Sequence, residues 1–166
     1  MTSADGPAGT FLLGVGCQKG GTAWMHRYLE SSPQCDPGFR KEYHVWDALD
    51  LPSGRLARDR IENQGGRRAD FLHDPDHYFD YFSGLVAPGR ARLTADITPA
   101  YAGLSPDRLR FVRAGFEARG VRPVRSRNTL AKALWLSNPT SVATRTMDWP
   151  LSVSISAAAS SRARRR

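Results

Sequence analysis

The feature that most constrains the fold is a glycine-rich turn between a short apolar run and an amphipathic segment. The apolar run covers 10–16, and a run of this length predicts a strand buried on both faces of a parallel sheet. After the turn, apolar side chains recur at helical spacing, which predicts a helix over 21–31 that Pro33 brings to an end. A second short strand is predicted over 37–42. Because strand, helix and strand follow in order, the sequence predicts a βαβ unit, which requires a parallel sheet with a right-handed crossover.

The rest of the first 124 residues predicts further elements of the same α/β fold. Residues 51–70 are polar and Arg-rich, and their prolines and glycines predict an excursion at the surface. Ser105 is a good N-cap with Pro106 at the first helical position, and Gly120 is a natural residue to follow the end of that helix. The predicted helices cover 76–83 and 106–119, and the predicted strands cover 91–96 and 121–124.

The net charge of +8 is concentrated in one late segment, so it does not indicate a nucleic-acid-binding protein. Residues 1–124 hold 16 Lys and Arg against 15 Asp and Glu, whereas residues 125–166 hold 8 Lys and Arg against one acid, Asp148. A basic tail can bind polyanions non-specifically, but it predicts no specific nucleic-acid partner. We expect a disordered N-terminus over 1–9 and a poorly ordered tail over 125–166, whose Ser-, Ala- and Arg-rich sequence cannot bury much surface.

The sequence predicts neither a membrane span nor a metal site. No stretch approaches the roughly 18 to 20 apolar residues that a span needs, and the N-terminus lacks the basic segment of a signal peptide, so a cytoplasmic location is expected. Cys17 and Cys35 have neither metal-ligand spacing nor a disulfide framework. The segment 73–77 (HDPDH) lacks a third well-spaced ligand, and a polar helix start explains it better than a metal does.

The turn over 16–22 has the composition of an anion-binding loop. Its glycines let backbone N–H groups approach an anion, and the N-terminus of the following helix adds unpaired donors and a positive dipole. Lys19 can reach a phosphate oxygen, and the Thr22 hydroxyl can donate to the same group. No Gly-Lys-Ser/Thr run of the Walker A type occurs, which argues against an ordinary ATPase or kinase. The alternative is a structural glycine turn with one solvated lysine.

Three segments, in this order, resemble motifs of sulfotransferases that use 3′-phosphoadenylyl sulfate (PAPS). Residues 14–34 look like the 5′-phosphosulfate loop of that family, whose pattern is Lys-x-Gly-Thr-Thr/Ser, although Ala23 stands where a second hydroxyl is usual. Residues 41–47 (KEYHVWD) are similar to the Lys-Glu-x-His-Phe-Phe-Asp segment of the heparan-sulfate and bacterial carbohydrate-type branch. Residues 96–101 (DITPAY) resemble the acid-x-Ser/Thr-Pro-x-Tyr segment of the same branch.

The resemblance implies a P-loop-type α/β fold, with 10–124 as the N-terminal part of a sulfotransferase domain. The implied activity is transfer of a sulfuryl group from PAPS, the co-substrate, to a hydroxyl of a carbohydrate or small metabolite, without a metal. Glu42 would be the catalytic base, Lys19 would stabilise the oxygen that bridges sulfuryl and phosphate, and Lys41 would lie beside the same charge. His44 is a second candidate for the base, because a histidine has the unperturbed pKa nearest neutrality. On the residues alone, Lys41 and Glu42 would be a solvated ion pair and His44 a packed histidine. The residues implied to bind the donor are Gln18, Lys19, Gly20, Gly21, Thr22, Ala23 and Trp24.

The sequence after Val124 departs from the family pattern. There the family has an Arg-Asp-Pro-x-x-Arg-x-x-Ser run whose Arg and Ser bind the 3′-phosphate of the donor, whereas this chain continues with 125–128 (RSRN). The composition changes at the same point, which suggests a shifted reading frame and an impaired, truncated domain. Two alternatives stay open: an inactive remnant that binds phosphate, and an atypical P-loop nucleotide kinase or NTPase.

Overall fold

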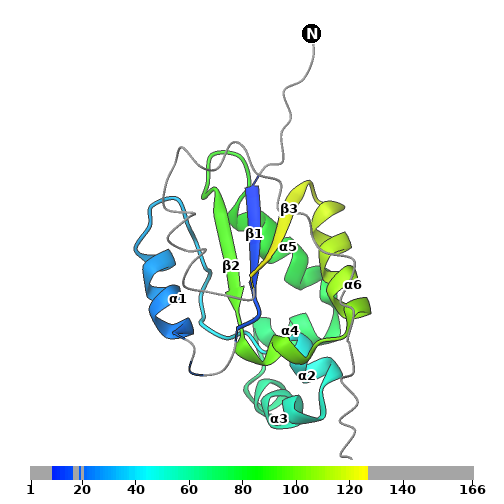
Figure 1. Ribbon diagram of the computed structural model, residues 1–166. Coiled ribbons are helices and arrows are strands. Elements are labelled where there is room, and N and C mark those ends of the chain that lie inside the picture. Colours follow the sequence, from blue (N-terminus) through cyan, green and yellow to red (C-terminus); the bar gives the residue numbers. More distant parts are fainter. Residues whose placement is uncertain (1–8, 17–18, 20, 127–166) are drawn as a thin grey trace, which may run out of the picture.

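The structure is a computed structural model that describes residues 9–16, 19 and 21–126 (Figure 1). The predictions of disorder over 1–8 and of a poorly ordered tail over 127–166 lie outside the described residues. Gly9, which was expected in a disordered N-terminus, instead opens the first strand, and Arg125 and Ser126, which were expected in the poorly ordered tail over 125–166, instead end the last described strand.

Three parallel strands form the centre of the molecule, in the order β2-β1-β3 (Figure 1). The prediction of a parallel sheet with flanking helices is therefore confirmed. In the register of the sheet, Leu12 of β1 pairs with Ala95 of β2 on one side and with Val124 of β3 on the other. The strands are β1 (Gly9–Gly14), β2 (Leu93–Ile97) and β3 (Val121–Ser126).

Helices of several lengths connect the strands and cover the sheet. The α-helices are α1 (Thr22–Glu30), α2 (Trp46–Asp50), α3 (Arg55–Gln64), α4 (Arg67–His73), α5 (Pro75–Leu85) and α6 (Pro106–Glu117). Two short 3₁₀ helices are η1 (Pro52–Gly54) and η2 (Pro99–Gly103). The predicted helices over 21–31, 76–83 and 106–119 are confirmed as α1, α5 and α6.

The two faces of the sheet bury separate apolar clusters, because successive side chains of a strand point to opposite faces. Leu12 packs toward α1 with Met25 and Leu29, in a small cluster. Phe11 and Leu13 belong to a much larger aromatic cluster under α5 and α6. Figure 1 shows α1 on one side of the sheet and α6 on the other. Each large apolar side chain that is fully buried contributes about 1.5–3 kcal/mol, so the larger cluster carries most of the stability.

The prediction of a strand over 37–42 is wrong. The only pairing near this segment, among the described residues, is an isolated parallel bridge between Cys35 and Leu93. Beyond it, Gly38 has φ 82°, and a Cβ there would lie 2.1 Å from the Tyr43 hydroxyl. A backbone in the left-handed region cannot continue a strand, and Gly38 is what lets the chain turn inward toward Tyr43.

The segment 51–70, expected as an excursion at the surface, is mostly helical. It forms η1, α3 and the first part of α4, and Ile61 and Ala69 anchor it to the core. The two glycines that suggested a loop separate two helices: Gly65 and Gly66 have φ 62° and 74°. Glycine adopts such positive φ values readily because it has no Cβ, so the two glycines mark a break between helices rather than a long loop.

Candidate functional site

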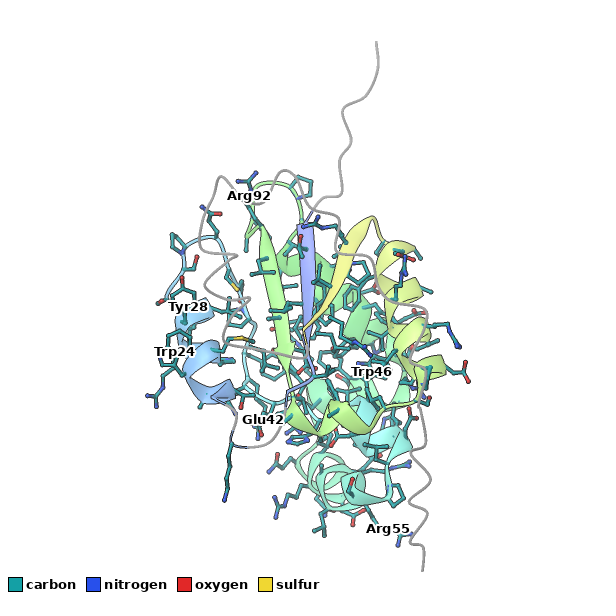
Figure 2. All side chains as sticks on the ribbon, in the orientation of Figure 1. Trp24, Tyr28, Glu42, Trp46, Arg55 and Arg92 are labelled. Carbon is teal, nitrogen blue, oxygen red and sulfur yellow. The ribbon has the colours of Figure 1, made fainter. Side chains whose placement is uncertain are left out.

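The candidate site lies at the edge of the sheet where the parallel strands end. Gly14, the last residue of β1, pairs with Ile97, the last residue of β2, so the segments that follow both strands begin side by side. Figure 2 shows Glu42 near this edge, close to the start of α1. In open parallel sheets, the carboxyl edge of the strands is where ligands bind.

The predicted donor loop is described in part. Gln18 and Gly20 lie outside the described residues, whereas Lys19, Gly21 and Thr22 lie within them. Lys19 is exposed with φ 62°, Gly21 precedes α1 with φ 83°, and Thr22 is the buried first residue of that helix. The first turn of α1 carries no acidic residue, so its free N–H groups face no negative side chain within the helix. The described part of the loop carries positive charge and free N–H donors, as an anion-binding site would. That the loop is a P-loop stays a prediction.

Two further residues of the predicted loop lie on α1. Ala23 is exposed and offers no hydroxyl. Trp24 is 47% exposed and stacks on Tyr28, with ring centroids 5.3 Å apart and an angle of 10° between the planes. Figure 2 shows both aromatic residues on the outer side of α1. The pair forms a rigid aromatic surface one turn of helix from the loop.

Three of the predicted catalytic residues contact one another in a chain that a fourth residue extends. Lys41 Nζ donates to Glu42 Oε1, and Glu42 Oε2 lies 3.5 Å from His44 Nε2. On its other side, His44 Nδ1 lies 2.8 Å from Asp47 Oδ2. The Lys41, Glu42 and His44 side chains are 31%, 32% and 29% exposed, so solutes can reach them, whereas Asp47 is buried. Sequence analysis included Asp47 in the motif over 41–47 but assigned it no role. The spacing of three residues between His44 and Asp47 was the one sign in the sequence that the two could interact.

The Asp47 carboxylate fixes the orientation and the charge of His44. The hydrogen bond from Asp47 raises the pKa of His44, burial acts in the opposite direction, and the charge of Glu42 adds a smaller increase. A carboxylate accepts only, so Nδ1 carries the proton of the neutral ring and Nε2 faces Glu42. When His44 is protonated, its ring donates toward both carboxylates.

Helix α1 packs beside the segment that carries Lys41 and Glu42. Burial lowers the pKa of His26 on α1, and the charges of Lys41 and Glu42 also act on it. The helix that begins at the predicted donor loop is therefore in electrostatic contact with the predicted catalytic pair. The first two motif segments, which are separate in the sequence, therefore lie near each other in the fold.

The backbone of the segment that carries Glu42 and His44 is strained. Glu42 and His44 have φ 60° and 56°, values that place two residues with side chains in the left-handed region. Each such residue costs on the order of 1–3 kcal/mol and persists only where its surroundings hold it. Tyr43, between them, is fully buried, and Arg68 Nε donates to its carbonyl at 3.0 Å. The segment is held from both its side chain and its backbone.

Asp96 is a fully buried carboxyl near the segment that carries Glu42 and His44. Its Oδ2 accepts hydrogen bonds from the hydroxyls of Tyr78 (2.9 Å) and Tyr101 (2.8 Å), and its Oδ1 accepts one from Thr98 (2.7 Å). Burial raises the pKa of Asp96 to about 6, while the hydrogen bonds act in the opposite direction. Sequence analysis included Asp96 in the motif over 96–101 but assigned it no role. Nothing in the sequence could show that Tyr78 reaches Asp96 from α5.

The segment 73–77 behaves as a helix start, as predicted. Asp74 Oδ1 accepts a hydrogen bond from the Asp76 N–H at 2.9 Å and so caps α5, and Pro75 is the first residue of that helix. His73 Nε2 lies 3.0 Å from Glu62 on α3. Across the described ranges, no group of three or more His, Cys, Asp or Glu side chains is arranged to hold a metal ion.

Two further predictions concern membranes and cysteines. Within the part of the chain that the structure describes, every helix is too short or too polar to cross a membrane. Cys35 is a free thiol, and burial raises its pKa to about 12. Cys17 lies outside the described residues.

The fold and the site define a class: an α/β protein whose three-stranded parallel sheet carries a cationic and acidic cluster at its carboxyl edge. Comparison with known proteins takes the identification no further, since no family model, no curated protein and no solved structure matches the chain.

Proposed function

We propose that this chain is the N-terminal part of a sulfotransferase domain that takes PAPS as donor and a hydroxyl of a carbohydrate or small metabolite as acceptor. The observation that supports the proposal is the convergence of the three motif segments. Helix α1, after the first motif, lies close enough to the second that the charges of Lys41 and Glu42 act on the pKa of His26, after burial and the charge of Glu30. The second and third motifs meet where the Val45 N–H donates to the Tyr101 hydroxyl at 3.1 Å.

The charges of the described loop suit the donor. Lys19, the backbone at Gly21 and the hydroxyl of Thr22 would hold the 5′-phosphosulfate, and Lys19 would stabilise the charge that develops on the leaving phosphate. PAPS, when bound, supplies the sulfuryl group. Trp24, stacked on Tyr28, is the residue in this region with an aromatic surface for a base.

Glu42 would accept the proton of the acceptor hydroxyl. Its two oxygens face different partners, Lys41 on one side and His44 on the other, so the carboxylate is held in one orientation. His44, oriented by Asp47, can take the proton from Glu42 or replace it as the base. The general-base step therefore needs only residues that already contact one another.

The donor affinity of this chain is expected to be reduced. The chain continues past Val124 without the Arg-Asp-Pro run, and each lost contact to a charged phosphate costs about 1.5–3 kcal/mol. We therefore propose impaired turnover, and a remnant that binds phosphate without turnover is the second candidate.

Calorimetric titration with 3′,5′-diphosphoadenosine tests the proposal. Lys19→Ala should weaken binding by about 1.5–3 kcal/mol, the range for a hydrogen bond to a charged group. Arg55→Ala is the matched control, because Arg55 is also exposed but lies on α3 (Figure 2) and should leave the affinity unchanged. Equal affinity of wild type and Lys19→Ala would remove the loop from the site. Mg²⁺-dependent turnover of ATP without diphosphoadenosine binding would favour a nucleotide kinase or NTPase.

A further inference from the structure

A hydrogen-bonded path runs from a buried carboxyl to the strained segment that carries Glu42 and His44. Asp96 Oδ2 accepts from the Tyr101 hydroxyl at 2.8 Å, and the same hydroxyl accepts from the Val45 N–H at 3.1 Å. Val45 directly follows His44, one of the two residues in the left-handed region. The path therefore ends on the peptide bond that fixes the backbone of His44.

The two ends of this path fix the direction of its hydrogen bonds, because the Val45 N–H can only donate and an ionised Asp96 can only accept. Ionised Asp96 can only accept, so the Tyr101 hydroxyl must point its proton at Asp96 and offer its lone pair to Val45. A neutral acid at Asp96 would itself carry a proton and would no longer impose this direction. The Tyr43 backbone also interacts with Asp96, on the other side of His44. Both peptide groups that flank the Tyr43–His44 pair thus depend on one buried group.

We propose that Asp96 is a positioning residue for Glu42 and His44, acting through the Tyr101 hydroxyl on the backbone at Val45. The role as a positioning residue rests on the proposed function, whereas the path itself does not. Arg68, which donates to the Tyr43 carbonyl, holds the same segment from α4. The strain at Glu42 and His44 explains why the segment needs such support: without it, the backbone would relax toward ordinary dihedral angles and move both side chains.

Two tyrosines provide a matched test. Tyr78 and Tyr101 both donate to Oδ2 of Asp96, and both are fully buried, but Tyr101 alone of the two also accepts from Val45. Tyr78→Phe and Tyr101→Phe each remove one hydroxyl from Asp96 and keep the ring. If the Tyr101 hydroxyl plays no part in holding the segment, the two variants should behave alike.

The first measurement is independent of activity. We expect amide hydrogen exchange at Val45 to accelerate about 3- to 10-fold in Tyr101→Phe, as for the loss of one hydrogen bond, and to stay near the wild-type rate in Tyr78→Phe. The NMR titration of the His44 ring should shift in Tyr101→Phe and not in Tyr78→Phe. Equal changes in the two variants, or no change in either, would overturn the proposal. Because the readout needs no donor, it remains decisive even if the chain binds no diphosphoadenosine, a result that would sink the proposed function alone.

A second measurement covers the case in which Tyr101→Phe does not fold. In the wild type, protection of the Val45 amide, corrected for intrinsic exchange, should fall as pH drops below about 6, where burial leaves Asp96 protonated. Asp96→Asn should remove this dependence, whereas the titration of His44 would persist. A dependence that survives in Asp96→Asn would assign it to another group and overturn the proposal. The titratable or charged groups that interact with Asp96 are Tyr43, His44, Arg68, Tyr78 and Tyr101.

Where turnover is measurable, the variants Tyr78→Phe and Tyr101→Phe distinguish a positioning role of Asp96 from a role in stability alone. Tyr101→Phe should lower kcat about 10- to 100-fold with KM for the donor unchanged, because a small displacement of catalytic groups is costly in the chemical step. Tyr78→Phe should retain kcat. Losses of kcat that simply follow the loss of stability in both variants would contradict a positioning role.

Discussion

The two faces of the sheet differ in how much they bury and in what they carry. The face under α5 and α6 packs a cluster of 21 buried residues rich in aromatic rings, such as Phe11 stacked on Phe116 at 3.8 Å. Among the described residues, the face under α1 packs five. The thin face carries the predicted donor loop, and the strained segment around Glu42 lies at the edge where the two faces meet. The difference suggests that the larger cluster, which includes Tyr43 and Val45, supplies the stability that holds the strained segment in place.

The largest effect is expected from a substitution of Glu42, which tests whether the segment at the edge of the sheet serves function rather than stability. Glu42→Gln keeps the shape of the side chain and removes the base, so single-turnover transfer from labelled PAPS should fall about 10²- to 10⁴-fold. Diphosphoadenosine affinity and the free energy of unfolding should both stay near their wild-type values, since the site does not hold the fold together. Near-wild-type transfer by Glu42→Gln would move the base role to His44.

Matched truncations test the inequality of the two faces. Phe82 is fully buried in the larger cluster and contacts Phe11 at 5.2 Å between ring centroids, so Phe82→Ala should lower the free energy of unfolding by about 3–5 kcal/mol. Leu29→Ala, in the small cluster under α1, should cost about 2 kcal/mol, because α1 can move to fill the space. Urea unfolding measures both. A larger loss for Leu29→Ala would mean that the thin face carries the fold.

The pH dependence of stability offers a third test, because Asp96 lies on the face of the sheet under α5 and α6 and supports the segment around Glu42. Burial raises its pKa in the folded protein to about 6 from 3.8, so folding favours the protonated carboxyl. Its stabilising contribution is therefore complete below about pH 4 and is lost as pH rises to about 6, on the order of 3 kcal/mol in total. Subtracting the unfolding free energies of Asp96→Asn from those of the wild type at each pH should give this decline. A difference that is flat or rises over the same range would contradict it.

The smallest expected effect is at the donor loop. Ala23 stands where the resemblance expects a second hydroxyl, and it is exposed at the start of α1. Ala23→Ser should strengthen diphosphoadenosine binding by about 0.5–1.5 kcal/mol, the net value of one hydrogen bond, without changing stability. Ala23→Val, which fills similar space without a hydroxyl, is the control. Equal affinity of the Ser and Val variants would exclude a contact with the ligand at this position.

The sequence predicted the elements whose signals are local. Helix α6 is an example, since Ser105, Pro106 and Gly120 mark its two ends in the chain itself. The strand expected over 37–42 failed because its path is set by distant contacts, among them the Tyr81 hydroxyl that the Phe39 N–H donates to across 42 positions. A tertiary contact of this kind overrides local β-propensity.

The candidate site likewise contains residues that the sequence could identify and residues that only the fold shows. Lys41, Glu42 and His44 are close in sequence, and a motif could therefore name them together. Arg68, Tyr101 and Asp96 act on the same segment from three separate elements, and their spacing in the sequence does not show that they do so. Sequence reasoning could find the groups that would perform the chemistry, whereas the groups that hold them in place required the fold.

The central position of β1 also has a kinetic consequence. Thr10 in this strand pairs with Leu93 and with Arg122, so its two neighbours are encoded 83 and 112 positions later. β1 is therefore made before either of the strands that pair with it, and its apolar side chains would stay exposed while α1 to α6 are made. Closing such long loops before any ladder forms is slow. The refolding rate should therefore be limited by docking of β1, the strand that carries the Phe-Leu-Leu stretch.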